Sequence, residues 1–274
     1  MKLKKIFAVF FAICMLLPMA VSAKVQELTI DGDHGKLAAN FQTPDNLSQY
    51  PIVMMLHGFG DTKESKFWID MANKLEAKGI ASIRFDFNGH GKSEGKFIQM
   101  TIPNEIVDAR KVFDYVRTLP EVTTISMVGG SQGGVVTAML AGELGSQVKS
   151  IALLAAAATL RDDCARGMFL GTSFDPENMP LTLKIGKKGP IIGRAYLETL
   201  YNLPIYETAE KYKGSVCLVH GLADTLIPYT ESLRLQHIYP DNELHLLKGV
   251  NHSYTPDPTP VIEIVVDFFE RHVR

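Results

Sequence analysis

The 274-residue chain has little of what marks several classes of protein. Its three cysteines are too few for a small domain held together by disulfides. Its 28 basic and 30 acidic residues leave a net charge of −2, without the basic excess that nucleic-acid binding requires. The cysteines are isolated and there is no H-E-x-x-H motif, so the sequence predicts no metal site and no cofactor.

Long hydrophobic runs are confined to the N-terminus. Three lysines among the first five residues precede the apolar segment Ile6–Leu17, and small residues follow at positions 21–23. This order is typical of a secretory signal peptide, so we expect cleavage after residue 23 and a protein that is periplasmic or secreted. The longest later apolar run, Ile151–Ala158, has eight residues, whereas a membrane-spanning helix needs about 20. No membrane span is therefore expected after cleavage.

The rest of the chain alternates short apolar runs with helical patterns. Six runs are typical of strands: Ile52–Leu56, Ile80–Phe85, Ile125–Val128, Ile151–Leu154, Val216–Val219 and Leu244–Leu247. Most are continuously apolar, which indicates parallel strands covered on both faces. Apolar residues at helical spacing lie between them, for example Trp68, Met71 and Leu75. Alternating segments at Val25–Ile30 and Leu37–Phe41 predict a hairpin at the sheet edge. Together these patterns predict a doubly wound, mostly parallel α/β domain.

One stretch, residues 159–206, interrupts this alternation. It contains no strand of normal length, and glycine, proline and lysine recur in it. Because it is long for a connecting loop, we interpret it as a cap or lid inserted into the domain. The expected organisation is a signal peptide at 1–23, followed by a single α/β domain at 24–274 that contains this insertion.

The pattern G-x-S-x-G occurs twice, and the surrounding sequence distinguishes the two matches. Ser131, in Gly129–Gly133, follows the predicted strand Ile125–Val128 and precedes a helical face of small residues. A nucleophile elbow requires that strand–turn–helix setting. Ser93, in Gly91–Gly95, is separated from its strand by polar residues and has no helix directly after it. We therefore predict Ser131 as the nucleophile and Ser93 as a loop residue.

A serine hydroxyl becomes a good nucleophile when a base takes its proton and a third group orients that base. In doubly wound hydrolases the order along the chain is serine, acid, histidine, each just after a strand. Asp224 and His252 follow the last two predicted strands and complete that order. His90 and Asp86 are the alternative base and acid, but both precede Ser131 in the chain.

Two backbone amides are expected to form an oxyanion hole. Gln132, the residue after the nucleophile, supplies one of them. Phe59, in the turn His57–Gly60, is predicted to supply the other, since a glycine on each side permits the backbone to bend.

Five segments of the chain are similar to those of a known protein family. They are His57–Phe59, Arg84–Gly91, Gly130–Val136, Leu203–Glu207 and His220–Asp224, within a similarity that extends from about Ile52 to the C-terminus. These segments resemble the bacterial cinnamoyl and feruloyl esterases. The resemblance implies an α/β-hydrolase fold, with residues 159–206 capping the pocket. It implies hydrolysis of hydroxycinnamate esters, including feruloyl groups on plant cell-wall polysaccharides.

The resemblance also implies that Asp163 and Tyr196 bind the phenolic end of the substrate. The chain departs from the family at Gly130, where histidine commonly precedes the nucleophile. It also departs near Leu170, where relatives have a polar contact.

The leading hypothesis is a serine carboxylesterase that cleaves hydroxycinnamate esters through an acyl-enzyme. Its expected partner is a small-molecule or polysaccharide-linked aromatic ester, and no nucleic acid. The same residues also suit a short-chain carboxylesterase, a thioesterase or a serine peptidase. A ligand-binding protein that keeps the fold without turnover is a further alternative.

Overall fold

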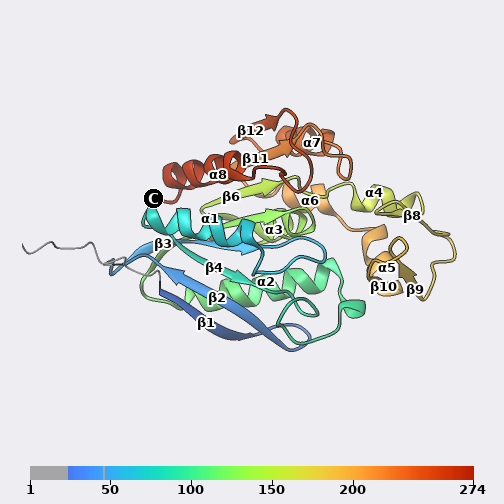
Figure 1. Ribbon diagram of the computed structural model, residues 1–274, viewed down its shortest axis with the longest axis horizontal. Helices are drawn as coiled ribbons and strands as arrows, with labels where there is room; N and C mark the ends of the chain where they lie inside the picture. Colours follow the sequence, from blue (N-terminus) through green and yellow to red (C-terminus); the bar gives the residue numbers. More distant parts are fainter. Residues whose placement is uncertain (1–23, 46) are drawn as a thin grey trace, which may run out of the picture.

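An eight-stranded sheet forms the centre of the protein (Figure 1). The computed structural model describes residues 24–45 and 47–274, so the predicted signal peptide lies outside the described residues and export stays a prediction. The strand order is β1-β2-β4-β3-β5-β6-β11-β12. Within this sheet of the described residues, only the β1–β2 and β2–β4 pairs are antiparallel. The strands are β1 (Lys24–Asp31), β2 (Lys36–Thr43), β3 (Tyr50–Leu56), β4 (Ala81–Phe85), β5 (Val122–Gly130), β6 (Ser150–Leu154), β11 (Ser215–Gly221) and β12 (Asn242–Leu247).

Helices cover both faces of this sheet, which is why its central strands are apolar without interruption. Every residue of β3, β4 and β6 is buried. Helices α1 (Lys66–Ala77) and α8 (Thr259–His272) share one hydrophobic core, while α2 (Ile102–Arg117), α3 (Gln132–Leu144) and α7 (Thr230–Ile238) contribute to the other. The predicted doubly wound α/β fold is thereby confirmed. In the described ranges, no helix has the length and apolar character needed to cross a membrane.

The segment between β6 and β11 contains only short elements. They are α4 (Leu160–Ala165), β7 (Met168–Phe169), β8 (Thr172–Ser173), β9 (Thr182–Lys184), β10 (Ile191–Gly193), α5 (Arg194–Tyr201) and α6 (Ile205–Ala209). Figure 1 shows α4, α5 and the small strands grouped beyond one end of the main sheet. We call the segment 159–206 the cap.

Candidate active site

Ser131 occupies the turn between β5 and α3. Its backbone angles, φ +53° and ψ −119°, are ones that residues with a side chain rarely adopt. Backbone hydrogen bonds hold this conformation: the Ser131 N–H donates to the Leu154 carbonyl at 2.8 Å, and the Ser131 carbonyl accepts from Gly134 and Ala157 at 3.0 Å and from Val135 at 3.3 Å. The strained turn presents the side chain at the carboxyl end of the central strands, as a nucleophile elbow does.

Two glycines let α3 approach β5 and the end of β3 closely at this turn. A Cβ on Gly129 would lie 2.2 Å from the Gly133 carbonyl oxygen, and a Cβ on Gly133 would lie 2.3 Å from the Leu56 carbonyl oxygen. Both contacts are with backbone and have no room to relax. By contrast, a Cβ on Gly130 would meet only the edge of the Trp68 ring, at 3.3 Å. The departure from the family's histidine at this position therefore leaves the elbow intact.

His252 and Asp224 are joined by a hydrogen bond of 2.7 Å between Nδ1 and Oδ2. The Asp224 side chain is fully buried, and its Oδ1 accepts from the N–H groups of Leu226 and Ile227 at 2.8 and 2.9 Å. Burial by itself raises the pKa of Asp224, but hydrogen bonds from His220 and His252 bring that pKa below its usual value. The ionised carboxylate holds the proton on His252 Nδ1 and leaves Nε2 as the basic nitrogen.

His220 fixes the loop that carries Asp224. Its Nδ1 lies 2.7 Å from the Ser232 hydroxyl, and its Nε2 lies 3.0 Å from the Ile227 carbonyl and 3.4 Å from Asp224 Oδ2. The imidazole thus ties the end of β11 to the loop and to α7. The contact of His220 with the acid was not predicted from the sequence.

The turn after β3 lies directly against the elbow. A Cβ on Gly58 would be 3.2 Å from Ser131 Cβ. His57 holds this turn, since its Nδ1 lies 2.9 Å from the Gly58 carbonyl and its Nε2 accepts from the Phe87 N–H at 3.2 Å. Burial lowers the pKa of His57, so the ring is neutral and can make both contacts.

The predicted oxyanion donors are available in this arrangement. Within residues 24–45 and 47–274, the N–H groups of Phe59 and Gln132 donate to no carbonyl or side chain. Gln132 is the first residue of α3, where the helix leaves its N–H groups without partners and favours negative charge. The turn and the helix start therefore offer two unpaired donors on either side of Ser131.

Ser131 and His252 line one cavity of about 370 Å³. Its walls consist of Gly58, Phe59, Asp61, Ser65, Phe67, Trp68, Gly130, Leu154, Leu170, Leu226, Ser253 and Tyr254. Among the described residues no hydrogen bond joins the Ser131 hydroxyl to the imidazole, and such contacts often tighten only when substrate binds. The aromatic residues in this cavity wall were not predicted to belong to the site. The helical spacing of Trp68, for example, is equally typical of a core residue.

Comparison with known proteins places the chain among hydrolases. The family model for serine aminopeptidases (S33) matches residues 48–177. The structure entitled ferulic acid bound to Est1E, from Butyrivibrio proteoclasticus, is 31% identical with a TM-score of 0.87, over 90% of this chain and 99% of that one. Another Est1E structure is 28% identical with a TM-score of 0.83, over 89% of this chain and 98% of its own. The chain belongs to the α/β-hydrolase superfamily. The matching family model and the similarity to Est1E identify it as a hydrolase.

Another relative of this α/β hydrolase is a thioesterase. The mitochondrial palmitoyl-protein thioesterase ABHD10 of Rattus norvegicus is 25% identical over 215 residues. The match covers 74% of this chain and 69% of the relative.

The second G-x-S-x-G match of this hydrolase is a structural loop. The Ser93 hydroxyl donates to the Asp86 carbonyl at 2.6 Å and accepts from the Ala38 N–H at 2.8 Å. The Asp86 carboxylate accepts from two further backbone N–H groups. His90 is buried, which lowers its pKa to about 4, and the nearby His57 adds to that effect. None of these three alternatives lines the cavity that holds Ser131.

The two predicted substrate-binding residues differ in their burial and in their hydrogen-bond partners. Asp163 accepts from the Thr159 hydroxyl at 2.9 Å, pairs with Arg166, and lines a second cavity of about 220 Å³. Tyr196 has no exposed surface, and its hydroxyl donates to Gln132 Oε1 at 2.5 Å. The prediction that both residues face the phenolic end therefore needs correction for Tyr196, whose hydroxyl is engaged in the core. The role of Asp163 stays a prediction.

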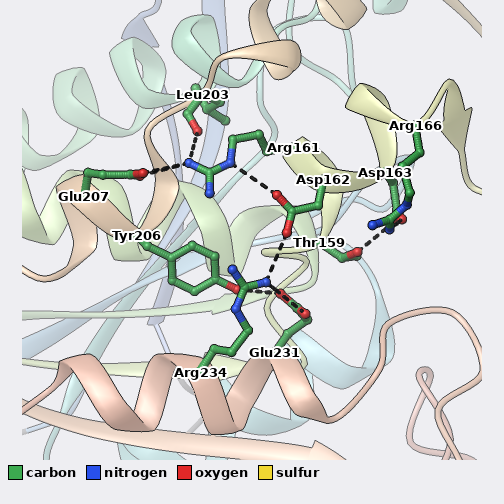
Figure 2. Close-up of polar contacts among 10 residues, drawn as sticks. All are labelled: Thr159, Arg161, Asp162, Asp163, Arg166, Leu203, Tyr206, Glu207, Glu231 and Arg234. Atoms are coloured by element: carbon green, nitrogen blue, oxygen red, sulfur yellow. Dashed lines mark hydrogen bonds and ion pairs between the residues drawn. The ribbon is translucent and has the colours of Figure 1, made fainter. Parts of the chain in front are cut away.

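Charged side chains tie both ends of the cap to α7, as Figure 2 shows. Arg161 on α4 contacts both carboxylate oxygens of Glu207 on α6, at 2.9 and 3.0 Å. Asp162 accepts from Arg234 on α7 at 3.1 Å, and that guanidinium lies 4.3 Å from the centre of the Tyr206 ring. Exposed ion pairs of this kind contribute little individually. Together they connect the cap to the helix that follows the Asp224 loop.

One group of possible metal ligands also converges in the described part of the chain. Cys217 on β11 pairs in register with Glu243 on β12, and His245 lies two residues further along the same face. Their ligand atoms lie within 4.8 Å of one another. However, Arg271 Nη2 lies 2.9 Å from each oxygen of Glu243, so a cation would compete with a guanidinium already in place. These residues do not line the cavity of Ser131.

Proposed function

We propose that this α/β hydrolase is a serine carboxylesterase that cleaves hydroxycinnamate esters. The observation that supports this most is the shared cavity of Ser131 and His252, with Asp224 hydrogen bonded to the imidazole on its far side. Two unpaired amide donors flank the serine. This is the arrangement that acyl transfer needs: a nucleophile, a base, an orienting acid and a site for the oxyanion.

The reaction follows from these positions. The Ser131 hydroxyl attacks the ester carbonyl while His252 Nε2 takes its proton, and Asp224 stabilises the resulting imidazolium. The N–H groups of Phe59 and Gln132 hold the negative charge that develops on the carbonyl oxygen. His252 then protonates the leaving alcohol as the C–O bond breaks. A water molecule, deprotonated by the same imidazole, hydrolyses the acyl-enzyme and regenerates the serine.

The shape of the site supports an aromatic acyl group. Phe67, Trp68 and Tyr254 give the catalytic cavity a wall of rings that suits a planar substrate. The second cavity shares Leu170 and Leu226 with the first. Asp163 lines the second cavity together with these two leucines and would offer a carboxylate to a phenolic hydroxyl. The 31% identity to Est1E, whose structure holds ferulic acid, supports the same acyl class.

A thioesterase is the second candidate, supported by the similarity to the rat palmitoyl-protein thioesterase. The cavity wall is largely apolar and would also accommodate an alkyl chain. The attacking groups would be the same, and only the leaving group would change from an alcohol to a thiol.

A panel of substrates distinguishes these activities. We expect kcat/KM for methyl ferulate to exceed that for p-nitrophenyl butyrate, a palmitoyl thioester and an aminoacyl anilide by about 10-fold or more, since each good pocket contact contributes about 10- to 200-fold. Asp163→Asn should reduce the preference for methyl ferulate over methyl cinnamate, which lacks the phenolic hydroxyl. Faster cleavage of the thioester or the butyrate would contradict the hydroxycinnamate proposal.

The binding-protein alternative calls for a different measurement. A fluorophosphonate probe should label the folded protein at Ser131, because the probe reports an activated serine regardless of acyl preference. Absence of labelling would favour a ligand-binding protein.

A further inference from the structure

A buried chain of hydrogen bonds connects the cap to the residue after the nucleophile. Gln132 Nε2 lies 2.8 Å from each carboxylate oxygen of Glu105 on α2, and Gln132 Oε1 accepts from the Tyr196 hydroxyl on α5 at 2.5 Å. The exposed fractions of Glu105, Gln132 and Tyr196 are 2%, 2% and 0%. Both ends of the Gln132 amide are thus occupied, one by the α/β domain and one by the cap.

Tyr196 also reaches the turn that carries the other oxyanion donor. Its ring centre lies 6.3 Å from that of Phe59 and 5.1 Å from that of Phe169, and the Phe59 and Phe169 rings are themselves 5.4 Å apart. Phe97 contacts Phe59 from another side, at 5.2 Å. A single cap residue therefore bonds to Gln132 through its hydroxyl and packs against Phe59 through its ring.

The mechanism described above uses only the backbone amides of Phe59 and Gln132, so the buried polar side chains call for their own explanation. A carboxylic acid in the core is costly, and burial raises the pKa of Glu105 to about 8, with Asp108 adding a smaller effect. A fully satisfied buried network makes its members rigid. Rigidity matters here because an oxyanion hole works only if its donors are already in place.

We propose that Glu105 and Tyr196 are positioning residues of the oxyanion hole, which they hold through the Gln132 side chain and the Phe59 ring. The geometry of the two donors then depends on the cap being seated, since Tyr196 belongs to the cap. This inference rests on the proposed function, because it assigns a role within the proposed oxyanion hole.

The test measures kcat and KM with p-nitrophenyl butyrate, whose short acyl group lacks the phenolic end that a substrate-binding residue of the cap would contact. Tyr196→Phe keeps the ring and removes the hydroxyl, and it should lower kcat about 10-fold with KM within about twofold, less than the 10²- to 10³-fold loss from deleting a donor. Glu105→Leu should give a similar loss. Glu105→Gln, which fills the same space and still accepts one hydrogen bond, should retain most of the activity.

A matched control is Tyr212→Phe. Tyr212 is also fully buried, and its hydroxyl donates to the Val148 carbonyl at 3.2 Å, away from the cavity. Its removal should leave kcat within about twofold. Equal losses in Tyr196→Phe and Tyr212→Phe would show a general effect of cavities in the core and overturn the proposal.

Comparing two substrates separates positioning from substrate binding. Tyr196→Phe should slow butyrate and methyl ferulate by the same factor. A loss of kcat on methyl ferulate alone would show that Tyr196 contacts the substrate, and would overturn the proposal. Unchanged kcat on both substrates in Tyr196→Phe and Glu105→Leu would also overturn it. Failure of the proposed function is recognised separately, because Ser131→Ala would then keep full activity.

The buried acid has its own pH signature. Glu105 faces the Gln132 amide, the Met100 thioether, Tyr196 and, by charge, Asp108. Because its pKa is raised from 4.5 to about 8 in the folded state, the wild type should lose stability as the pH rises between those values. The melting temperature of Glu105→Gln should therefore rise relative to the wild type between pH 6 and 8. A constant difference across that range would mean that Glu105 is not a buried acid.

Discussion

Replacement of Ser131 by alanine is expected to lower kcat for ester hydrolysis by about 10⁴- to 10⁶-fold. The remaining residues would still bind substrate and polarise its carbonyl through the unpaired amides, so KM should change little and a small rate above water should persist. Loss of the nucleophile abolishes the acyl-enzyme, which mass spectrometry after brief exposure to methyl ferulate or a fluorophosphonate would detect as an adduct on Ser131 in the wild type only.

Ser93→Ala is the control for this experiment, because the second G-x-S-x-G match offers the same short motif in a different setting. The Ser93 hydroxyl makes two hydrogen bonds, one donated and one accepted, that hold its loop. Its loss should cost about 1–3 kcal/mol of stability while kcat stays within a few-fold of the wild type. Full activity in Ser131→Ala together with inactive Ser93→Ala would reverse the assignment of the nucleophile.

Asp224→Asn is expected to lower kcat by about 10³- to 10⁴-fold with KM nearly unchanged. An asparagine is close in shape to the aspartate, so the hydrogen bonds from the Leu226 and Ile227 N–H groups can persist. What is lost is the negative charge beside His252 Nδ1, at 2.7 Å. Without it the imidazole is no longer held in the required tautomer, and its cation is no longer stabilised when Ser131 attacks.

Asp86→Asn is the comparison for Asp224→Asn, since Asp86 is the alternative acid. Its carboxylate accepts from the N–H groups of Lys63 and Lys92 at 2.7 and 2.9 Å, and it does not line the cavity. The substitution should reduce stability and leave kcat within about 10-fold of the wild type. A loss as large as that of Asp224→Asn, measured at equal folded fraction, would contradict the assigned triad.

Both expected losses concern residues that could be predicted from short stretches of sequence. The strand–turn–helix setting of Ser131 is visible in a continuous apolar run, two glycines and a face of small residues. The carboxyl ends of parallel strands meet at one edge of a sheet, so the order of Ser131, Asp224 and His252 along the chain was enough to expect them near one another. α7 was missed, because its apolar residues are few and Leu233 is exposed.

The cap was predictable only as an insertion. Its strands are two or three residues long, too short to produce a recognisable alternation. The resemblance to feruloyl esterases pointed to Asp163 and Tyr196 as a pair, yet only Asp163 lines a cavity, while the Tyr196 hydroxyl is hydrogen bonded in the core. Tyr196 instead reaches Gln132, a residue 64 positions away in the chain.

Chain periodicity and motif order thus predicted the class of fold and the candidate reacting groups, because both are properties of neighbouring residues along the backbone. The hydrogen-bond partners of buried polar side chains could not be predicted in this way, because they depend on how separate helices and strands pack. Glu105 lies on α2, Gln132 on α3 and Tyr196 on α5, and nothing in their local sequences indicates that the three meet. They meet because packing brings the three helices together, and each polar group in that dry contact must then find a partner.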